Sequence, residues 1–86
     1  LNINTEIANN VTNAQSAVTE AEGTVAGLES ALASYGNVSD DDTEAQAAKR
    51  ALEEKLNDAR NDLNDKRNKL TEAQDALEKA NNELTL

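Results

Sequence analysis

The feature that most constrains this chain of 86 residues is an apolar repeat whose spacing alternates between four and three. Such spacing places every apolar side chain on one stripe of a helix, which is the heptad pattern of coiled coils. In the first half the stripe consists of Ile7, Val11, Ala14, Val18, Ala21, Val25, Leu28, Leu32 and Tyr35. In the second half it consists of Leu52, Leu56, Ala59, Leu63, Lys66, Leu70, Ala73, Leu77, Ala80 and Leu84. The repeat therefore predicts two amphipathic helices.

Composition agrees with helices and limits the size of the core. Apolar residues make up 37% of the chain, which has one Tyr and no Phe, Met, Trp or Pro. Without larger side chains, a chain of this length can bury only a narrow seam of Ala, Val and Leu. The abundance of Ala, Leu, Glu, Asp and Lys is typical of long helices. We therefore expect a single, slender all-α domain.

The two stripes do not share one phase. Continuing the first stripe would place Asp42 and Lys49 at heptad position d, whereas the second stripe needs both at position a. One continuous helix would therefore lose its stripe at the join. We predict an antiparallel two-stranded coiled-coil helical hairpin, with helices over 1–35 and 43–86 and a turn over 36–42. At about 1.5 Å per residue, its arms would measure roughly 50 to 65 Å.

Helix-ending and helix-starting residues stand at this join. Gly36 is suited to the left-handed conformation that ends many helices, and it directly follows Tyr35. Ser39 precedes Asp42 by three residues, which is the spacing of a capping box at a helix start. These signals favour a turn between two helices.

The register can be predicted from how residue sizes combine across the seam. Small residues meet large ones in several layers when the chain folds back to pair Val25 with Leu52, Ala21 with Leu56, Val18 with Ala59, Ala14 with Leu63 and Ile7 with Leu70. Alternating small and large residues lets two helices approach closely while filling each layer.

Two lysines fall on the predicted seam. In this register Lys49 faces Leu28 and Lys66 faces Val11. A lysine beside a two-stranded seam can lay its stem on apolar residues and keep its ammonium in water, whereas the centre of a four-helix bundle would trap the charge. The lysines therefore favour a thin rod.

The second helix is predicted to outlast the first. Position 76 would already face residue 1, so Leu77, Ala80 and Leu84 would extend beyond the first helix. We expect these apolar residues to contact upstream chain, a second copy or a neighbouring domain. The chain also begins with Leu rather than Met, and we expect it to be part of a longer protein or assembly.

The turn carries the other candidate interaction residues, which are Asn37, Ser39, Asp40, Asp41 and Asp42. A calcium loop of the EF-hand kind needs Gly at its sixth position and Glu at its twelfth. Frames that start at residue 37 or 40 satisfy neither requirement. We therefore interpret the acids as capping and solubilising groups on an exposed tip, and a small cation-binding module remains the least favoured of three hypotheses.

Charge and composition bear on the classes of partner and chemistry. The net charge of -9 argues against nucleic acid and anionic membranes, both of which need clustered Lys or Arg. There is no apolar run long enough to insert into a membrane. The chain has no Cys and no His, and a thin hairpin offers no concave site. We therefore predict no enzymatic activity, no cofactor and no metal.

Other local patterns predict surface features. Asp62 and Asp65 stand four residues before Lys66 and Lys69, which is the spacing of ion pairs on a helix surface. Gly23 and Gly27 fall on the outer face of the first helix, at heptad positions f and c. They predict a softened stretch of helix rather than a packing site.

From about residue 52 to 84 the repeat L-x2-A-x3-L resembles helical hairpins of bacterial secretion and surface proteins. Instances of it are Leu56-Ala59-Leu63 and Leu70-Ala73-Leu77. The resemblance is to stalks of Gram-positive surface adhesins and to coiled-coil hairpins of periplasmic secretion adaptors. Efflux adaptors usually carry an Arg, Leu and Ser signature near the tip, and this tip has no such Arg. Short hairpins that polymerise, such as secretion needle subunits, are similar in size.

The resemblance implies an extracellular or cell-surface location and a structural role. We expect a non-enzymatic spacer or docking arm whose partner is another protein or a further copy of the chain. The alternative is a self-assembling filament or secretion-adaptor subunit that uses the overhang and the Ala-rich positions Ala17, Ala31, Ala48 and Ala76.

Overall fold

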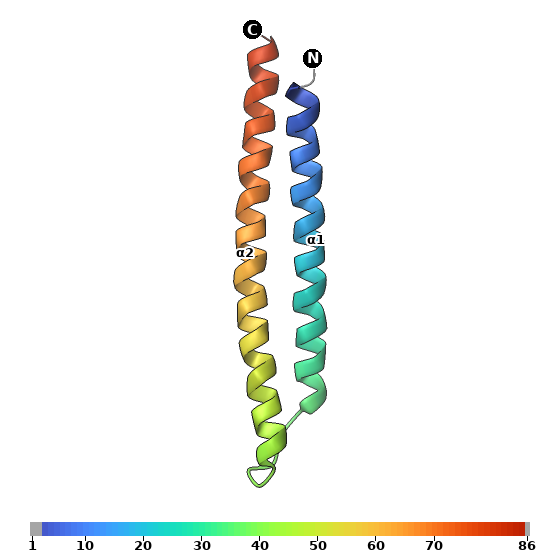
Figure 1. Cartoon of the computed structure of the whole chain (residues 1–86), viewed down its shortest axis with the longest axis vertical. Helices are drawn as coiled ribbons and strands as arrows, with labels where there is room; N and C mark the ends of the chain where they lie inside the picture. Colours follow the sequence, from blue (N-terminus) through green and yellow to red (C-terminus); the bar gives the residue numbers. More distant parts are fainter. Residues whose placement is uncertain (1–2, 86) are drawn as a thin grey trace.

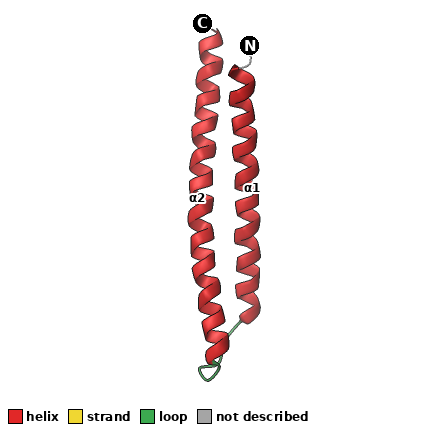
Figure 2. Ribbon diagram, viewed as in Figure 1, coloured by secondary structure: helices red, strands yellow, loops and turns green. Residues whose placement is uncertain are grey.

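The computed structural model describes residues 3–85 of the chain, and the side chains of residues 5–83. It contains two helices, α1 (Ile3–Tyr35) and α2 (Thr43–Thr85), joined by one loop (Figures 1 and 2). The helices lie side by side and antiparallel in a rod of 69 × 14 × 13 Å. The predicted all-α hairpin, with its second helix longer than its first, is therefore confirmed.

The core is a single seam between the helices. Its buried residues are Val18, Ala21, Val25, Leu56 and Leu63, each at most 8% exposed. Leu28, Leu32, Ala59 and Leu70 are partly buried and pack against them. Every one of these residues belongs to the two predicted stripes. The heptad repeat thus identified the core, which lies in the middle of the rod.

The end of α1 matches the sequence prediction. Gly36 has a φ of +57°, in the left-handed region. Its N–H donates to the carbonyl of Ala33 at 3.1 Å, which satisfies one of the free carbonyls in the last turn. Gly36 therefore ends the helix as predicted.

The residue that caps α2 differs from the prediction, because Asp42 rather than Ser39 is the N-cap. The Asp42 Oδ1 accepts a hydrogen bond from the N–H of Ala45 at 3.1 Å, which is the geometry of an N-cap. The Ser39 carbonyl instead accepts from the N–H of Asp42 at 3.0 Å. Ser39 thus belongs to a separate turn that precedes the helix.

The predicted register is wrong by one heptad. Arg60 and Glu29 form an ion pair across the helices at 3.2 Å. In the predicted register Glu29 would lie level with Ala48, about 18 Å along the axis from Arg60. Sliding the helices by seven residues brings Glu29 level with Lys55, about 7.5 Å from Arg60, which two long side chains can span.

Two other contacts agree with the shifted register. Arg67 pairs with Glu22 at 3.3 Å; in the shifted register Glu22 lies level with Asp62, again about 7.5 Å along the axis from Arg67. Lys49 Nζ donates to the carbonyl of Gly36 at 3.4 Å, so the end of α1 lies beside Lys49 rather than beside Asp42. In Figure 1, accordingly, α2 reaches past the end of α1 toward the loop.

The shift changes the surroundings of both lysines and of the predicted overhang. Lys49 lies at the end of α1 rather than facing Leu28. Lys66 comes level with Val18 and remains one-third exposed in its side chain, as expected for a lysine whose stem lies on the seam. Position 76 comes level with residue 8 instead of residue 1, so the overhang of α2 is one heptad shorter than predicted.

The glycines of α1 offer a direct test of helix propensity. Gly23 and Gly27 are exposed, and a Cβ on either would meet no atom within 4 Å. Gly23→Ala and Gly27→Ala should each raise the free energy of unfolding by about 1 kcal/mol, because Ala loses less backbone entropy in a helix. Urea unfolding followed by circular dichroism measures this gain.

The matched control is Gly36→Ala. The same methyl group also meets no atom within 4 Å there, but the backbone is left-handed. This variant should lose about 1 kcal/mol. A gain at Gly36, or a loss at either helical glycine, would contradict this account of the three positions.

Candidate interaction surface

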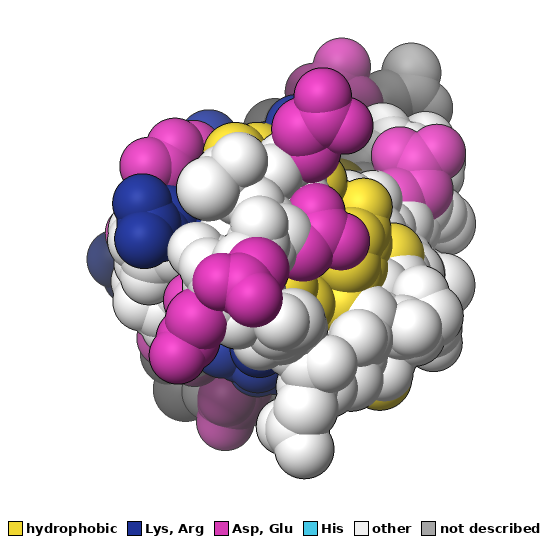
Figure 3. All heavy atoms as spheres, turned by 90° about the horizontal axis from the view of Figure 1, so that it is seen from below, with side chains coloured by type: hydrophobic (Ala, Val, Ile, Leu, Met, Phe, Trp, Pro, Cys, Tyr) yellow, Lys and Arg dark blue, Asp and Glu magenta, His cyan; other side chains and the backbone are white. Residues whose placement is uncertain are grey.

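Six of the seven residues of the tip, residues 36–42, are exposed. Asn37, Ser39, Asp40, Asp41 and Asp42 are all exposed, as the sequence predicts for a surface turn. Viewed along the rod from this end, acidic side chains gather beside a small area of apolar surface (Figure 3). The tip therefore presents carboxylates and amides to solvent next to the open end of the seam.

Hydrogen bonds link the residues of the tip to one another and to α2. The Ser39 carbonyl accepts from the side-chain amide of Gln46 at 3.1 Å, in addition to its bond with the N–H of Asp42. The Ser39 hydroxyl accepts from the N–H of Asp41 at 3.4 Å. Ser39 is therefore the organising residue of the turn, while Asp40 and Asp41 point their charges to water without a bonding role for their carboxylates among the described residues.

Because α1 ends short of the tip, a shallow hollow forms beside the first turns of α2. It is lined by Asn37, Val38, Gln46, Lys49, Arg50 and Glu53. Val38 is partly buried there, and the hollow is open and mainly polar. Its side chains, two of which belong to the tip, offer hydrogen-bond donors, acceptors and both signs of charge. They suit a polar contact with another protein.

A second shallow hollow runs along the edge between the helices. Glu29, Leu32, Ala33, Gly36, Lys49, Leu56 and Arg60 line it. Its floor is the seam and its sides are charged residues from both helices. Lys49 belongs to both hollows and connects the edge of the rod with the tip.

The predicted residues fall at opposite ends of the rod. Asn37 to Asp42 lie in the tip, whereas Leu77 and Ala80 lie near the other end, where α1 begins and α2 ends and which we call the base (Figure 1). Leu77 and Ala80 are partly buried. The side chain of Leu84 lies outside the described residues. The structure therefore does not bring the two predicted groups into one site.

No cluster of three or more His, Cys, Asp or Glu side chains within residues 3–85 is arranged to hold a metal ion. At the tip, one oxygen of Asp42 is already used in capping α2. Among the same residues, neither helix has an apolar stretch that could cross a membrane.

The ion pairs that cross between the helices were not predicted from the sequence. Glu22–Arg67 and Glu29–Arg60 lie at position e of each helix, and we call them the edge pairs. Their side chains are 52–56% exposed, so each pair contributes little to stability by itself. They could have been predicted by asking, in each register that differs by a whole number of heptads, whether charges at the facing e positions have opposite signs.

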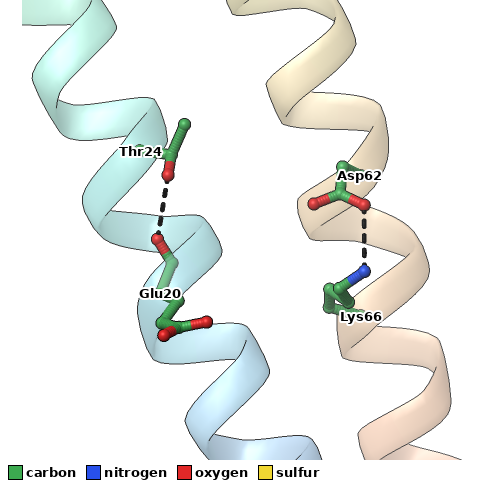
Figure 4. Close-up of polar contacts among 4 residues, drawn as sticks. All are labelled: Glu20, Thr24, Asp62 and Lys66. Atoms are coloured by element: carbon green, nitrogen blue, oxygen red, sulfur yellow. Dashed lines mark hydrogen bonds and ion pairs between the residues drawn. The ribbon is translucent and has the colours of Figure 1, made fainter.

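Contacts within single helices are closer to prediction. Lys66 pairs with Asp62 at 3.1 Å, as the spacing of four predicts (Figure 4). Asp65 and Lys69 form no such pair among the described residues. On α1, the Thr24 hydroxyl donates to the carbonyl of Glu20 at 3.2 Å, so this polar side chain is satisfied within its own helix (Figure 4).

Comparison with known proteins found no relative of this chain. No protein-family model matches the chain, and neither the curated proteins nor the solved structures contain a match.

Proposed function

We propose that the chain is a non-enzymatic structural and interaction module. It acts as an acidic spacer or docking arm of an extracellular, cell-surface or secretion-related bacterial protein. Its partner is another protein, which it contacts through the tip. The role of an arm needs no pocket or cofactor; it needs length, stiffness and an exposed end.

The observation that carries this proposal is the shape of the rod. A length of 69 Å on a cross-section of 14 × 13 Å places the tip far from the base for a chain of this size. α1 begins and α2 ends at the base (Figure 1), so the tip lies at the far end of the rod from both. The hydrogen-bonded turn at Ser39 keeps the tip ordered for contact.

A self-assembling filament or secretion-adaptor subunit is the second candidate. The seam supports it, because a two-helix hairpin covers its apolar residues from one side only. Ile7, Val11, Leu70 and Leu77 remain partly exposed along the base half of the rod. Ala17, Ala31 and Ala48 are partly buried at the flanking g positions, where small side chains allow another helix to approach.

Sedimentation velocity over a wide concentration range distinguishes the two roles. A spacer should sediment as a monomer from micromolar to millimolar concentration, with a maximum dimension near 70 Å by small-angle scattering. Species that grow with concentration would overturn the spacer and favour the filament. A globular scattering profile would contradict both.

A further inference from the structure

The seam of this hairpin is compatible with more than one register. Apolar residues recur every seven positions on both helices, so sliding α2 along α1 by one heptad again places stripe against stripe. The alternative that pairs Ala21 with Leu56 instead of Leu63 has the small-to-large layers described in the sequence analysis. Something other than the repeat must therefore help to select the register of the structure.

We propose that three polar contacts act as the register selector, and that the hairpin switches to a second register, one heptad away, when they are changed. The selector consists of the two edge pairs, Glu22–Arg67 and Glu29–Arg60, and the Lys49–Gly36 contact. This role goes beyond the proposed arm function and does not depend on it.

The edge charges discriminate between the two registers. In the structure both edge pairs join opposite charges. After a slip of one heptad, Glu22 would meet Arg60, but Glu29 would meet Glu53, which occupies the preceding e position of α2. One attraction would thus be replaced by a repulsion. Because the rest of the edge is uncharged on α1, no other e-position pair compensates.

Lys49 discriminates in the same direction. In the structure its ammonium donates to the carbonyl of Gly36 at 3.4 Å, beside the C-terminal end of α1, where a positive charge is favoured by the helix dipole. In the second register it would face Leu28 on the seam. Lys49 therefore stabilises the observed register and opposes the other.

The loop does not prevent the slip. Seven residues, 36–42, connect the helices, and in the structure they run beside the first turns of α2, where Asn37 and Val38 line a hollow with Gln46 and Arg50. In the second register the ends of both helices would lie level. A seven-residue connection, able to span about 23 Å when extended, is long enough for either arrangement.

The slip would couple the two ends of the rod. Moving α2 by seven residues displaces it by about 10.5 Å along α1. Its protrusion at the tip would disappear, and Leu77, now partly buried, would pass beyond the first turn of α1 at the base. A partner that engaged the edge arginines would therefore change both ends of the arm.

Pairs of cysteines report the register directly, because the chain has no Cys of its own. One pair is Ala21→Cys with Leu63→Cys, and the matched pair is Ala21→Cys with Leu56→Cys; all three positions are buried. A disulfide needs Cα atoms within about 7 Å, and a heptad offset adds about 10.5 Å. In the native background the 21/63 pair should oxidise at least about ten-fold faster than the 21/56 pair.

The switch is tested by repeating both measurements in Lys49→Leu/Glu53→Arg/Arg67→Gln. This background leaves one attractive edge pair in the observed register and gives two in the second. It also places Leu opposite Leu28 in the second register. The order of the two oxidation rates should reverse. The control background Arg50→Gln/Glu54→Arg/Lys79→Gln makes charge changes of the same size at exposed outer positions, leaves the net charge unchanged as the triple variant does, and should keep the native order.

Several outcomes would overturn the proposal. Faster oxidation of 21/63 in the triple variant would show that the seam alone sets the register. Reversal in the control background would show that charge changes anywhere on α2, and not the edge pairs, are responsible. Loss of the helical circular dichroism signal in the triple variant would show that the second register is not an available fold.

Discussion

Leu56→Ala should lower the free energy of unfolding by about 3 kcal/mol. Leu56 is 5% exposed, the least of any buried residue in the seam. Truncating a buried Leu removes its transfer free energy and leaves a cavity that two nearly straight helices close only in part. Since small domains are only marginally stable, this is a large share of the total. Urea and thermal unfolding by circular dichroism measure the loss.

Leu77→Ala is the matched control, with the same atoms removed from the same helix. Leu77 is only partly buried, near the base. Its truncation should therefore cost about 1 kcal/mol, because the Leu77 side chain buries less apolar surface in the native state than the Leu56 side chain does. Equal losses at the two leucines would contradict a core centred on the middle of the rod.

Lys66→Leu should make the hairpin associate more strongly than the unmodified chain does. Lys66 occupies a seam position and interrupts the apolar stripe of α2. Its ammonium reaches water and pairs with Asp62. A leucine there would complete a continuous apolar stripe that two helices cannot cover. Hairpins would then pair seam to seam as a four-helix bundle. Sedimentation equilibrium should show dimers at about micromolar concentration.

Lys79→Leu removes the same charge and adds the same side chain at an exposed position away from the seam. This variant should sediment as the unmodified chain does. Association of both variants would mean that net charge keeps the rod monomeric, whereas association of Lys66→Leu alone assigns that role to its place on the seam.

The elements of the fold could be predicted from the sequence because each has a local cause. The spacing of four and three selects helices with one apolar face, and the phase change between the two stripes requires a break. Gly36 marks where α1 ends, and its positive φ is the conformation that glycine adopts at least cost. These signals lie within a few residues of the structure that they determine.

The register could not be predicted in the same way. A heptad stripe is unchanged by a shift of seven residues, so residue sizes along it give nearly equivalent answers for neighbouring registers. The difference lies in longer-range contacts between exposed charges, such as Glu29 with Arg60. Flanking charges must be tested in each register, since a single trial register pairs Glu22 with the wrong partner.

The cap of α2 was misplaced for a related reason. Ser39 and Asp42 are both residues that cap helices, and they stand one turn apart. Ser39 accepts hydrogen bonds in its own turn through its carbonyl and its hydroxyl, which leaves Asp42 to accept from Ala45. Two strong capping residues in succession predict a helix start, but tertiary placement of the loop decides which of them caps.

The position of both chain ends at the base has a mechanical consequence. A force that pulls the two helices apart at the base acts on one layer of the seam at a time. The helices would therefore separate progressively from the base toward the tip. A force between base and tip instead loads both helices along their axes and strains every layer of the seam together. The same rod is therefore weak against a load that separates its ends and resistant to one carried along its length.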